Sequence, residues 1–361
     1  MRTPWGKILP IEIFHTLIIG SLLLFITCGK NTHPPVNREA PLKLFQRGVA
    51  ALEAGRPEEA KFWVNKAIQQ RPQLAMFHYV LGQIYLSESK KDSAISAFET
   101  ALNFKSHYPE VWVALAPLYV EKEQYEAAIP ILNSLVERFP DSTGYRLTLA
   151  EMYIQIGKAA LGLDELKILH QNGSKTPEIF LLRGMAYLAL ENYEKAIAEL
   201  EEYLRIRPES LRALKMLGVA YLKNGDPEKG MSLLNRALQI QPNDGEVFLY
   251  RAEYFWKNGK MEAAEAQLNR GLKLDSLLAE GYSLKAKIAL ARKDTTEAVT
   301  LLEKALRIKR QCYSCMRQLA FILFNQKNLE EARYWLERYM QTSPVYDAQA
   351  DSLLRKLPNT Y

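Results

Sequence analysis

The sequence contains only three cysteines and five histidines among its 361 residues. Two of the cysteines, Cys312 and Cys315, form a Cys-x-x-Cys pair, but a zinc site would need two further ligands and no second pair supplies them. No histidine follows Cys315, so the haem-attachment pattern is not met either. We therefore predict no metal site and no cofactor.

The chain also lacks the short motifs that carry common catalytic chemistry. It contains no glycine-rich phosphate loop, no His-Glu-x-x-His and no Gly-x-Ser-x-Gly. The net charge is a modest +6, and lysines and arginines are interleaved with glutamates along the chain. Such interleaving is typical of solvated helix surfaces and gives little support to nucleic-acid binding. We expect no enzymatic activity, no nucleic-acid ligand and no small-molecule substrate.

The apolar run near the N-terminus is short. It covers residues 16–27, twelve residues without a charge, and Arg2 and Lys7 precede it. A membrane span needs about twenty such residues, whereas this length is ordinary for the core of a signal peptide. We expect residues 1–27 to be a signal sequence. Residues 28–40 are polar with paired prolines, which is typical of a short stalk.

Cys28 directly follows this run and resembles the lipidated cysteine of bacterial lipoproteins. The resemblance implies that the mature chain begins at Cys28 and is held in a membrane by a thioether-linked lipid. The preceding Phe25, Ile26 and Thr27 depart from the family's preference for leucine at the first position and a small residue at the last. An uncleaved signal anchor and simple secretion are the alternatives. The expected location is the bacterial cell envelope, facing the periplasm or the exterior.

A repeat of 34 residues runs from Pro41 to Tyr346 without an insertion. Nine windows begin at residues 41, 75, 109, 143, 177, 211, 245, 279 and 313. Their eighth and twentieth positions hold only glycine or alanine, which lets two helices approach closely. Position eleven is mostly Tyr or Phe, and position thirty-two is proline in five windows, where it ends one helix before the next begins.

This order of small, bulky and proline positions resembles the tetratricopeptide repeat family. The resemblance implies an all-α fold, an α-solenoid in which nine helix-turn-helix repeats form a right-handed superhelix. It also implies that the first helix of each repeat lines the concave side. Residues 347–361 follow the repeats. Asp347 as N-cap, with Leu353, Leu354 and Leu357 on one face, predicts a helix that caps the last repeat.

The concave groove is where a partner is expected to bind. Positions 4, 7, 8 and 11 of each first helix are core positions, so positions 2, 5, 9 and 12 form the adjacent stripe that faces the groove. This stripe is largely apolar in the first, second, third and fifth windows and charged in the sixth to ninth. The residues predicted to bind a protein or peptide are Phe45, Val49, Tyr79, Gln83, Val113, Met185, Lys215, Glu253, Trp256, Lys287 and Arg317. Packing between neighbouring first helices is the alternative for the aliphatic members, whereas the aromatic ones are expected to bind.

Cys312 and Cys315 lie at the junction of the eighth and ninth windows. In an oxidising compartment they are expected to form a local disulfide, with two half-buried thiols as the alternative. Taken together, the sequence predicts a membrane-tethered scaffold that binds another protein during assembly of an envelope, secretion or pilus complex. The alternative function is a non-catalytic accessory subunit of a complex for polysaccharide export or cell-wall synthesis.

Overall fold

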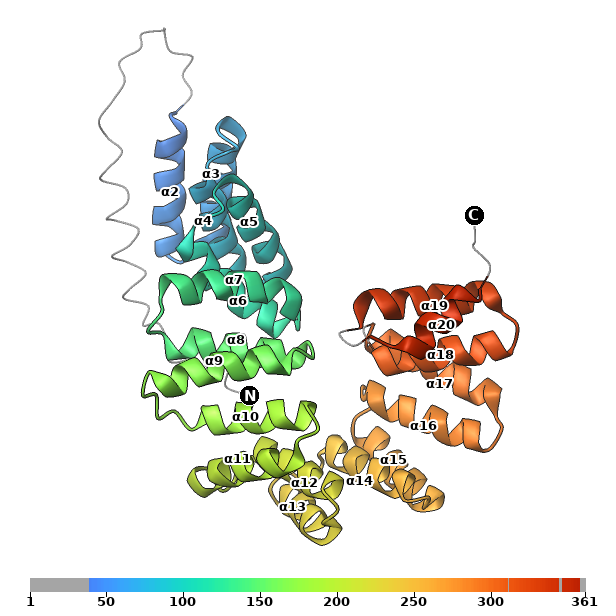
Figure 1. The fold of residues 1–361 in the computed structure, drawn as a ribbon. Helices are drawn as coiled ribbons and strands as arrows, with labels where there is room; N and C mark the ends of the chain where they lie inside the picture. Colours follow the sequence, from blue (N-terminus) through green and yellow to red (C-terminus); the bar gives the residue numbers. More distant parts are fainter. Residues whose placement is uncertain (1–38, 311, 344–345, 358–361) are drawn as a thin grey trace. The chain divides into compact units, whose positions relative to one another are not determined.

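The computed structural model describes residues 39–310, 312–343 and 346–357. These ranges are helical, without a strand among them, and Figure 1 shows their helices joined by short turns. The all-α prediction is therefore confirmed. The expected signal segment, Cys28 and almost all of the expected stalk lie outside the described residues. Within the described ranges, no helix has the length and apolar character that a membrane crossing requires.

Each 34-residue window contains two helices, and its first helix begins at or one residue after the start of the window. The first helices are α2 Pro41–Glu53, α4 Ala75–Ser87, α6 Pro109–Glu121, α8 Thr143–Gln155, α10 Glu178–Ala189, α12 Leu211–Lys223, α14 Gly245–Lys257, α16 Ala279–Ala291 and α18 Tyr313–Asn325. The second helices are α3 Pro57–Gln70, α5 Lys91–Phe104, α7 Tyr125–Arg138, α9 Ala159–Gln171, α11 Tyr193–Ile206, α13 Pro227–Ile240, α15 Met261–Leu274, α17 Thr295–Ile308 and α19 Leu329–Thr342. A shorter helix, α20 Ala348–Arg355, follows.

The turn between the two helices of a repeat has the same backbone conformation in every window. The fifteenth residue always has a positive φ, from 55° at Glu123 to 87° at Gly225, and only four of the nine are glycine. In the windows other than the fourth, the next N–H donates to the carbonyl five residues earlier, as from Arg56 to Ala51 at 2.9 Å. This hydrogen bond ends the first helix and reverses the chain, with or without a glycine.

The small residues predicted at positions eight and twenty lie at the contact between the two helices of a repeat. Ala60, Ala94 and Ala128 are fully buried, and a Cβ added to Gly82 would lie 2.4 Å from the ring of Phe98. Position twenty-seven departs from the family pattern in four windows, and its larger side chains are buried as well: Leu135, Leu169, Tyr203 and Tyr339. The core therefore accommodates these departures.

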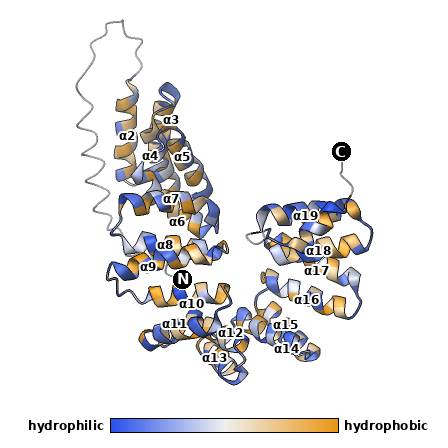
Figure 2. Ribbon diagram, in the orientation of Figure 1, coloured by the Kyte–Doolittle hydropathy of each residue, from blue (hydrophilic) through white to orange (hydrophobic). Residues whose placement is uncertain are grey.

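The chain divides into two compact units, each described by itself. One contains the residues up to Gln155 together with Asp164–Ser174, and its apolar core extends from Leu44 to Met152. The other contains Ile156–Leu163 and the residues from Lys175 onward. In both units most helices carry apolar and polar residues on different sides (Figure 2), so that each buries a stripe against its neighbours.

Helix α20 covers the last repeat, as predicted. The Oδ1 atom of Asp347 accepts hydrogen bonds from the N–H groups of Gln349 and Ala350, both at 3.0 Å. Ala350 and Leu357 are buried, and they belong to the same apolar cluster as α18 and α19. The polar caps and the buried face together attach α20 to the end of the second unit.

Candidate protein-binding site

Two aromatic residues predicted to bind a partner are core residues instead. Phe45 is 2% exposed and stacks on Phe77, with ring centroids 4.8 Å apart. Tyr79 is 6% exposed, its ring lies 5.5 Å from that of Tyr108, and burial raises the pKa of its hydroxyl above the ordinary value. The prediction for both was wrong because position five of these first helices packs against the next repeat. Neither ring is accessible to a ligand.

The aliphatic members of the predicted stripe serve largely as packing residues. Val49 and Val113 are half-buried against the core of the first unit, and Met185 is half-buried against a cluster in the second. Gln83 is also half-buried, and its Nε2 donates to the Tyr79 hydroxyl at 2.9 Å. The alternative of packing between neighbouring helices therefore accounts for the aliphatic residues.

Two charged members of the stripe are held by partners within the fold. Lys215 lies with its Nζ 2.9 Å from Oδ2 of Asp244 and also pairs with Glu246. Arg317 donates from Nε to Oδ2 of Asp347 at 2.6 Å, and so helps to dock α20. Their charges are satisfied inside the second unit, which leaves them little capacity to recognise a partner.

The remaining three predicted residues, Glu253, Trp256 and Lys287, come together in one pocket of about 310 Å³ in the second unit. The first helices α12, α14, α16 and α18 all contribute to it. Its lining consists of Lys223, Glu253, Trp256, Lys257, Glu280, Ser283, Leu284, Lys287 and Ser314. This volume is at the lower end for ligand pockets and suits one or two side chains of a partner.

Some of the charged side chains around the pocket have an ion-pair partner and others have none. Glu280 accepts from Nζ of Lys309 at 2.7 Å; burial raises the pKa of Glu280, but this lysine lowers it by more, and the pKa lies below its ordinary value. By contrast, Lys223, Lys257 and Lys287 form no ion pair within the described ranges. All three are exposed. The pocket therefore has three ammonium groups without an ion pair beside the half-buried indole of Trp256, and that of Lys223 lies 5.8 Å from the centroid of the Tyr193 ring.

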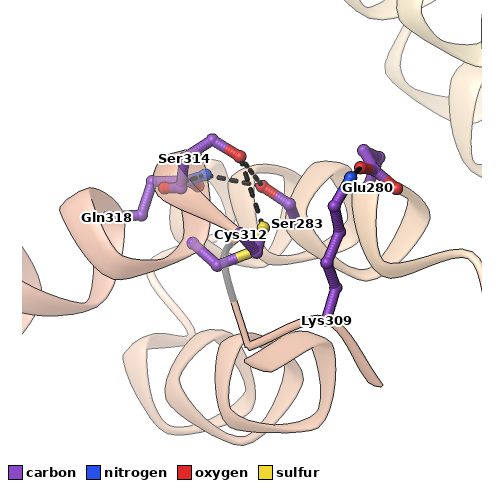
Figure 3. The surroundings of a disulfide bond; sticks show 7 residues. Glu280, Ser283, Lys309, Cys312, Ser314 and Gln318 are labelled. Atoms are coloured by element: carbon purple, nitrogen blue, oxygen red, sulfur yellow. Dashed lines mark hydrogen bonds and ion pairs between the residues drawn. A yellow bond between two sulfur atoms is a disulfide. The ribbon is translucent and has the colours of Figure 1, made fainter. Parts of the chain in front are cut away.

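One wall of the pocket is built on the start of α18, where a disulfide joins Cys312 to Cys315 (Figure 3). The Cys312 sulfur lies 3.6 Å from Oγ of Ser314, which in turn lies 3.4 Å from Oγ of Ser283. Nε2 of Gln318 donates to Ser283 Oγ at 2.7 Å. Both serines line the pocket, so the disulfide is in direct contact with its wall.

Sequence reasoning missed the two lysines that end first helices, Lys223 and Lys257. Both occupy position thirteen of their windows, directly after position twelve, the last position of the groove-facing stripe. The signal was the helical period: positions nine and thirteen lie on the same face of a helix, so position thirteen also belongs to the groove-facing stripe. In the described part of the chain, no three His, Cys, Asp or Glu residues are grouped in a way that could hold an ion.

Comparison with family models decides the classification. Two tetratricopeptide repeat models match, one over residues 45–109 and 181–245, the other over residues 85–152, 224–288 and 289–357. The second alone matches more than half of the chain. The chain belongs to the tetratricopeptide repeat family. Repeats of this family are protein-interaction modules, so the chain is a scaffold for binding another protein.

Individual similar proteins are distant. Human protein O-mannosyl-transferase TMTC1 is 24% identical over 137 residues, which are 38% of this chain and only 15% of that protein. Among solved structures, a tetratricopeptide repeat protein from Parabacteroides merdae is 19% identical, covering 78% of this chain and 98% of its own with a TM-score of 0.43. Yeast Tom70 is 13% identical, covering 87% and 95% respectively, with a TM-score of 0.47.

Proposed function

We propose that this tetratricopeptide repeat chain is tethered to a membrane of the bacterial cell envelope and holds a segment of a partner protein in the pocket around Trp256. The pocket carries this proposal, because four successive first helices supply its lining and its lysines form no ion pair with any described residue. A role in assembling an envelope, secretion or pilus complex follows from a binding module held at that surface.

The chemistry of the pocket favours one kind of segment. Lys309 compensates the charge of Glu280, so three lysines face the single uncompensated carboxylate of Glu253. Trp256 and Leu284 supply an apolar wall between the charges. A partner segment that places a carboxylate beside an apolar side chain matches both features, since interfaces combine an aromatic anchor with complementary charge.

Photo-crosslinking in the native envelope tests the site. A photoreactive residue in place of Lys287 is expected to form an adduct with one partner protein. The adduct should fall by about tenfold in the variant that combines Lys223→Glu with Lys257→Glu, because opposite-charge contacts become like-charge contacts. Both lysines are exposed, so the fold should tolerate the change. Unchanged adducts in that variant would show that the pocket does not recognise the partner.

Lys273→Glu provides the matched control. This lysine is exposed on the second helix α15 and lies outside the pocket lining, so its reversal should leave the adduct unchanged. The identity of the captured protein then separates the two candidate roles. A component of a secretion or pilus machine supports the assembly role, whereas a polymerase or glycosyltransferase supports the accessory-subunit role.

Membrane tethering is tested at Cys28, which lies outside the described residues. If Cys28 carries the lipid, Cys28→Ser should abolish incorporation of a labelled fatty acid into the protein. Several acyl chains hold a protein firmly, since each buried methylene contributes about 0.8 kcal/mol. Labelling that persists in Cys28→Ser would refute the lipoprotein assignment. Membrane association without labelling in the wild type would indicate the signal anchor.

A further inference from the structure

The Cys312–Cys315 disulfide occupies a position that helix caps occupy in other repeats. Cys312 is the N-cap of α18, and Cys315 is the third residue of the helix. At the N-cap of α12, Ser210 accepts a hydrogen bond from the N–H of Ala213, again the third residue. Asp244 does the same for Val247 in α14. Thus a covalent bond in α18 joins the two positions that a hydrogen bond joins elsewhere.

The disulfide also lies close to the hydrogen bonds that position residues of the pocket lining. Glu280, Ser283 and Ser314 all line the pocket, and each is held by a group close to the disulfide (Figure 3). The Glu280 carboxylate accepts a hydrogen bond from Nζ of Lys309 at 2.7 Å. The backbone carbonyl of Lys309 in turn accepts a hydrogen bond from the N–H of Cys312 at 3.1 Å. Ser314 sits between the two cysteines in sequence. If the first turn of α18 opened, it would release these contacts together.

The Cys312 side chain offers no hydrogen bond of its own to the helix start. Without the disulfide, the start of α18 would keep the backbone hydrogen bonds from Cys315 and Met316 to the Cys312 carbonyl but would lose the covalent link across its first turn, and a helix end without a side-chain restraint opens more readily. Gln318 would be affected as well. Its Nε2 bonds to Ser283 and to the Ser314 carbonyl, while its buried Oε1 has no partner among the described residues.

We infer that oxidation of Cys312 and Cys315 completes the pocket wall, so that the partner site is assembled only after the chain has reached an oxidising compartment. This inference rests on the proposed function, because it concerns the same pocket and the same location outside the cytoplasm. The chain in a reducing environment would keep its repeats but present a loosened start of α18.

The chemistry requires a disulfide-bearing oxidant, since two thiols must lose two electrons and two protons. Cys312 is 4% exposed and Cys315 is fully buried, so the Cys312 thiolate attacks the external disulfide and forms a mixed disulfide. The oxidant releases one thiolate at this step. The Cys315 thiolate then attacks the Cys312 sulfur, and the second thiolate of the oxidant leaves. The two protons of the cysteine thiols pass to the released thiolates. Once formed, the bond is shielded by its burial.

Hydrogen–deuterium exchange of the purified full-length protein tests the inference without any ligand. We compare protein oxidised with glutathione disulfide, protein reduced with dithiothreitol, and the Cys312→Ala plus Cys315→Ala variant, which adds no hydrogen-bonding cap, with thiol alkylation recording the redox state. Reduction should speed exchange in the first turn of α18 and in residues 280–284 by about fivefold to tenfold, the effect of losing a helix cap. Reoxidation should restore the slow exchange.

Two controls make the result specific. Dithiothreitol should have no effect on the double alanine variant, which shows that Cys312 and Cys315 are the reduced groups. Ser210→Ala removes a hydrogen-bonded cap and should speed exchange at the start of α12 while leaving residues 280–284 unchanged. Equal exchange at residues 280–284 in oxidised and reduced protein would overturn the inference. Failure of the Lys287 crosslink would instead count against the proposed function, because exchange is measured without a partner.

Discussion

Lys215 on α12 binds the carboxylate that caps the following first helix, with its Nζ 2.9 Å from Oδ2 of Asp244. The other oxygen of Asp244 accepts from the N–H groups of Glu246 and Val247 at the start of α14. Asp244 thus caps α14 with one carboxylate oxygen and forms an ion pair with Lys215 of the preceding repeat with the other. Burial lowers the pKa of Lys215, but the hydrogen bonds that it donates to the carboxylates of Glu246 and Asp244 raise this pKa by more, so that it lies above its ordinary value.

Lys215→Met should therefore weaken the contact between the sixth and seventh repeats. The Lys215 side chain is 11% exposed and that of Asp244 is 5% exposed, so the variant leaves a buried carboxylate without its cation. We expect a loss of about 2 kcal/mol, below the range for a fully buried pair because Glu246 is half exposed. The free energy of local opening of α14, measured by hydrogen exchange, checks this. Lys122→Met breaks an exposed ion pair with Asp92 and should change stability by less than about 0.5 kcal/mol.

The same contact explains why part of the site could not be predicted. Lys215 and Arg317 both occupy position five, and helical spacing alone places that position on the groove-facing stripe. Each side chain instead reaches about thirty residues along the sequence to an aspartate N-cap. A periodic pattern gives the direction of a Cβ but not the partner of a long, flexible side chain. Trp256 and Lys287, by contrast, both line the pocket, and Lys287 forms no ion pair within the described ranges.

Acid should detach α20 before it unfolds the repeats. Burial raises the pKa of Asp347, but Arg317 and the Ala350 N–H lower it by more, so the folded carboxyl has a pKa below its value in the unfolded chain. Asp347 therefore stabilises the docked helix above about pH 4, and this contribution is lost as pH falls through the lower, folded pKa. Limited digestion with pepsin along a series of falling pH values should release the C-terminal segment first.

Asp347→Asn isolates this effect. Asparagine retains an acceptor for the cap but has no charge to lose, so the variant should be cleaved more readily near pH 5, with a weaker dependence on pH. The carboxylate within α20, Asp351, titrates in both proteins. A wild type and an Asp347→Asn variant with the same pH profile would show that the Arg317 pair does not control docking.

The sequence predicted the helix pairs well, because glycine and alanine at the close contacts recur in every window. It did not reveal the turn at position fifteen, since a left-handed residue is recognised by glycine and five windows have another residue there. At Lys293, φ is 65°, imposed by the hydrogen bond from Asp294 N–H to the Ala289 carbonyl. Tertiary structure therefore overrides the local preference.

Lys293→Gly should stabilise the eighth repeat, since glycine adopts this conformation without the steric cost of a Cβ. We expect a gain of about 1 kcal/mol in the free energy of unfolding. Gly259→Ala is the matched opposite change, because Gly259 has φ of 71° and an added Cβ would meet nothing within 4 Å. Its loss of about 1 kcal/mol would then come from the backbone alone. Urea unfolding measures both, and a destabilised Lys293→Gly would contradict the argument.

At position eight of a repeat, glycine provides space for the neighbouring helix and not a positive φ. The space available for an added Cβ differs between the second and sixth repeats. Gly82→Ala would place a Cβ 2.4 Å from the fully buried ring of Phe98, which cannot bend away. We expect a loss of about 2 kcal/mol from overpacking. In Gly218→Ala the Cβ would lie 3.0 Å from Cγ and Cδ2 of the fully buried Leu234 and 3.2 Å from the carbonyl oxygen of Gly230, a looser contact than at Gly82. The higher helix propensity of alanine should offset this smaller clash to within about 0.5 kcal/mol.

Windows with alanine at position eight all have leucine at position twenty-four, as in the pair Ala116 and Leu132. Phe98→Leu should therefore rescue Gly82→Ala, although it leaves a small cavity when made alone. The double variant should be more stable than the sum of the two single losses predicts, by about 1 kcal/mol or more, since the two side chains share one space. Urea unfolding of all four proteins in the cycle gives this coupling. Strictly additive losses would mean that the Phe98 ring is not the reason why residue 82 has to be glycine.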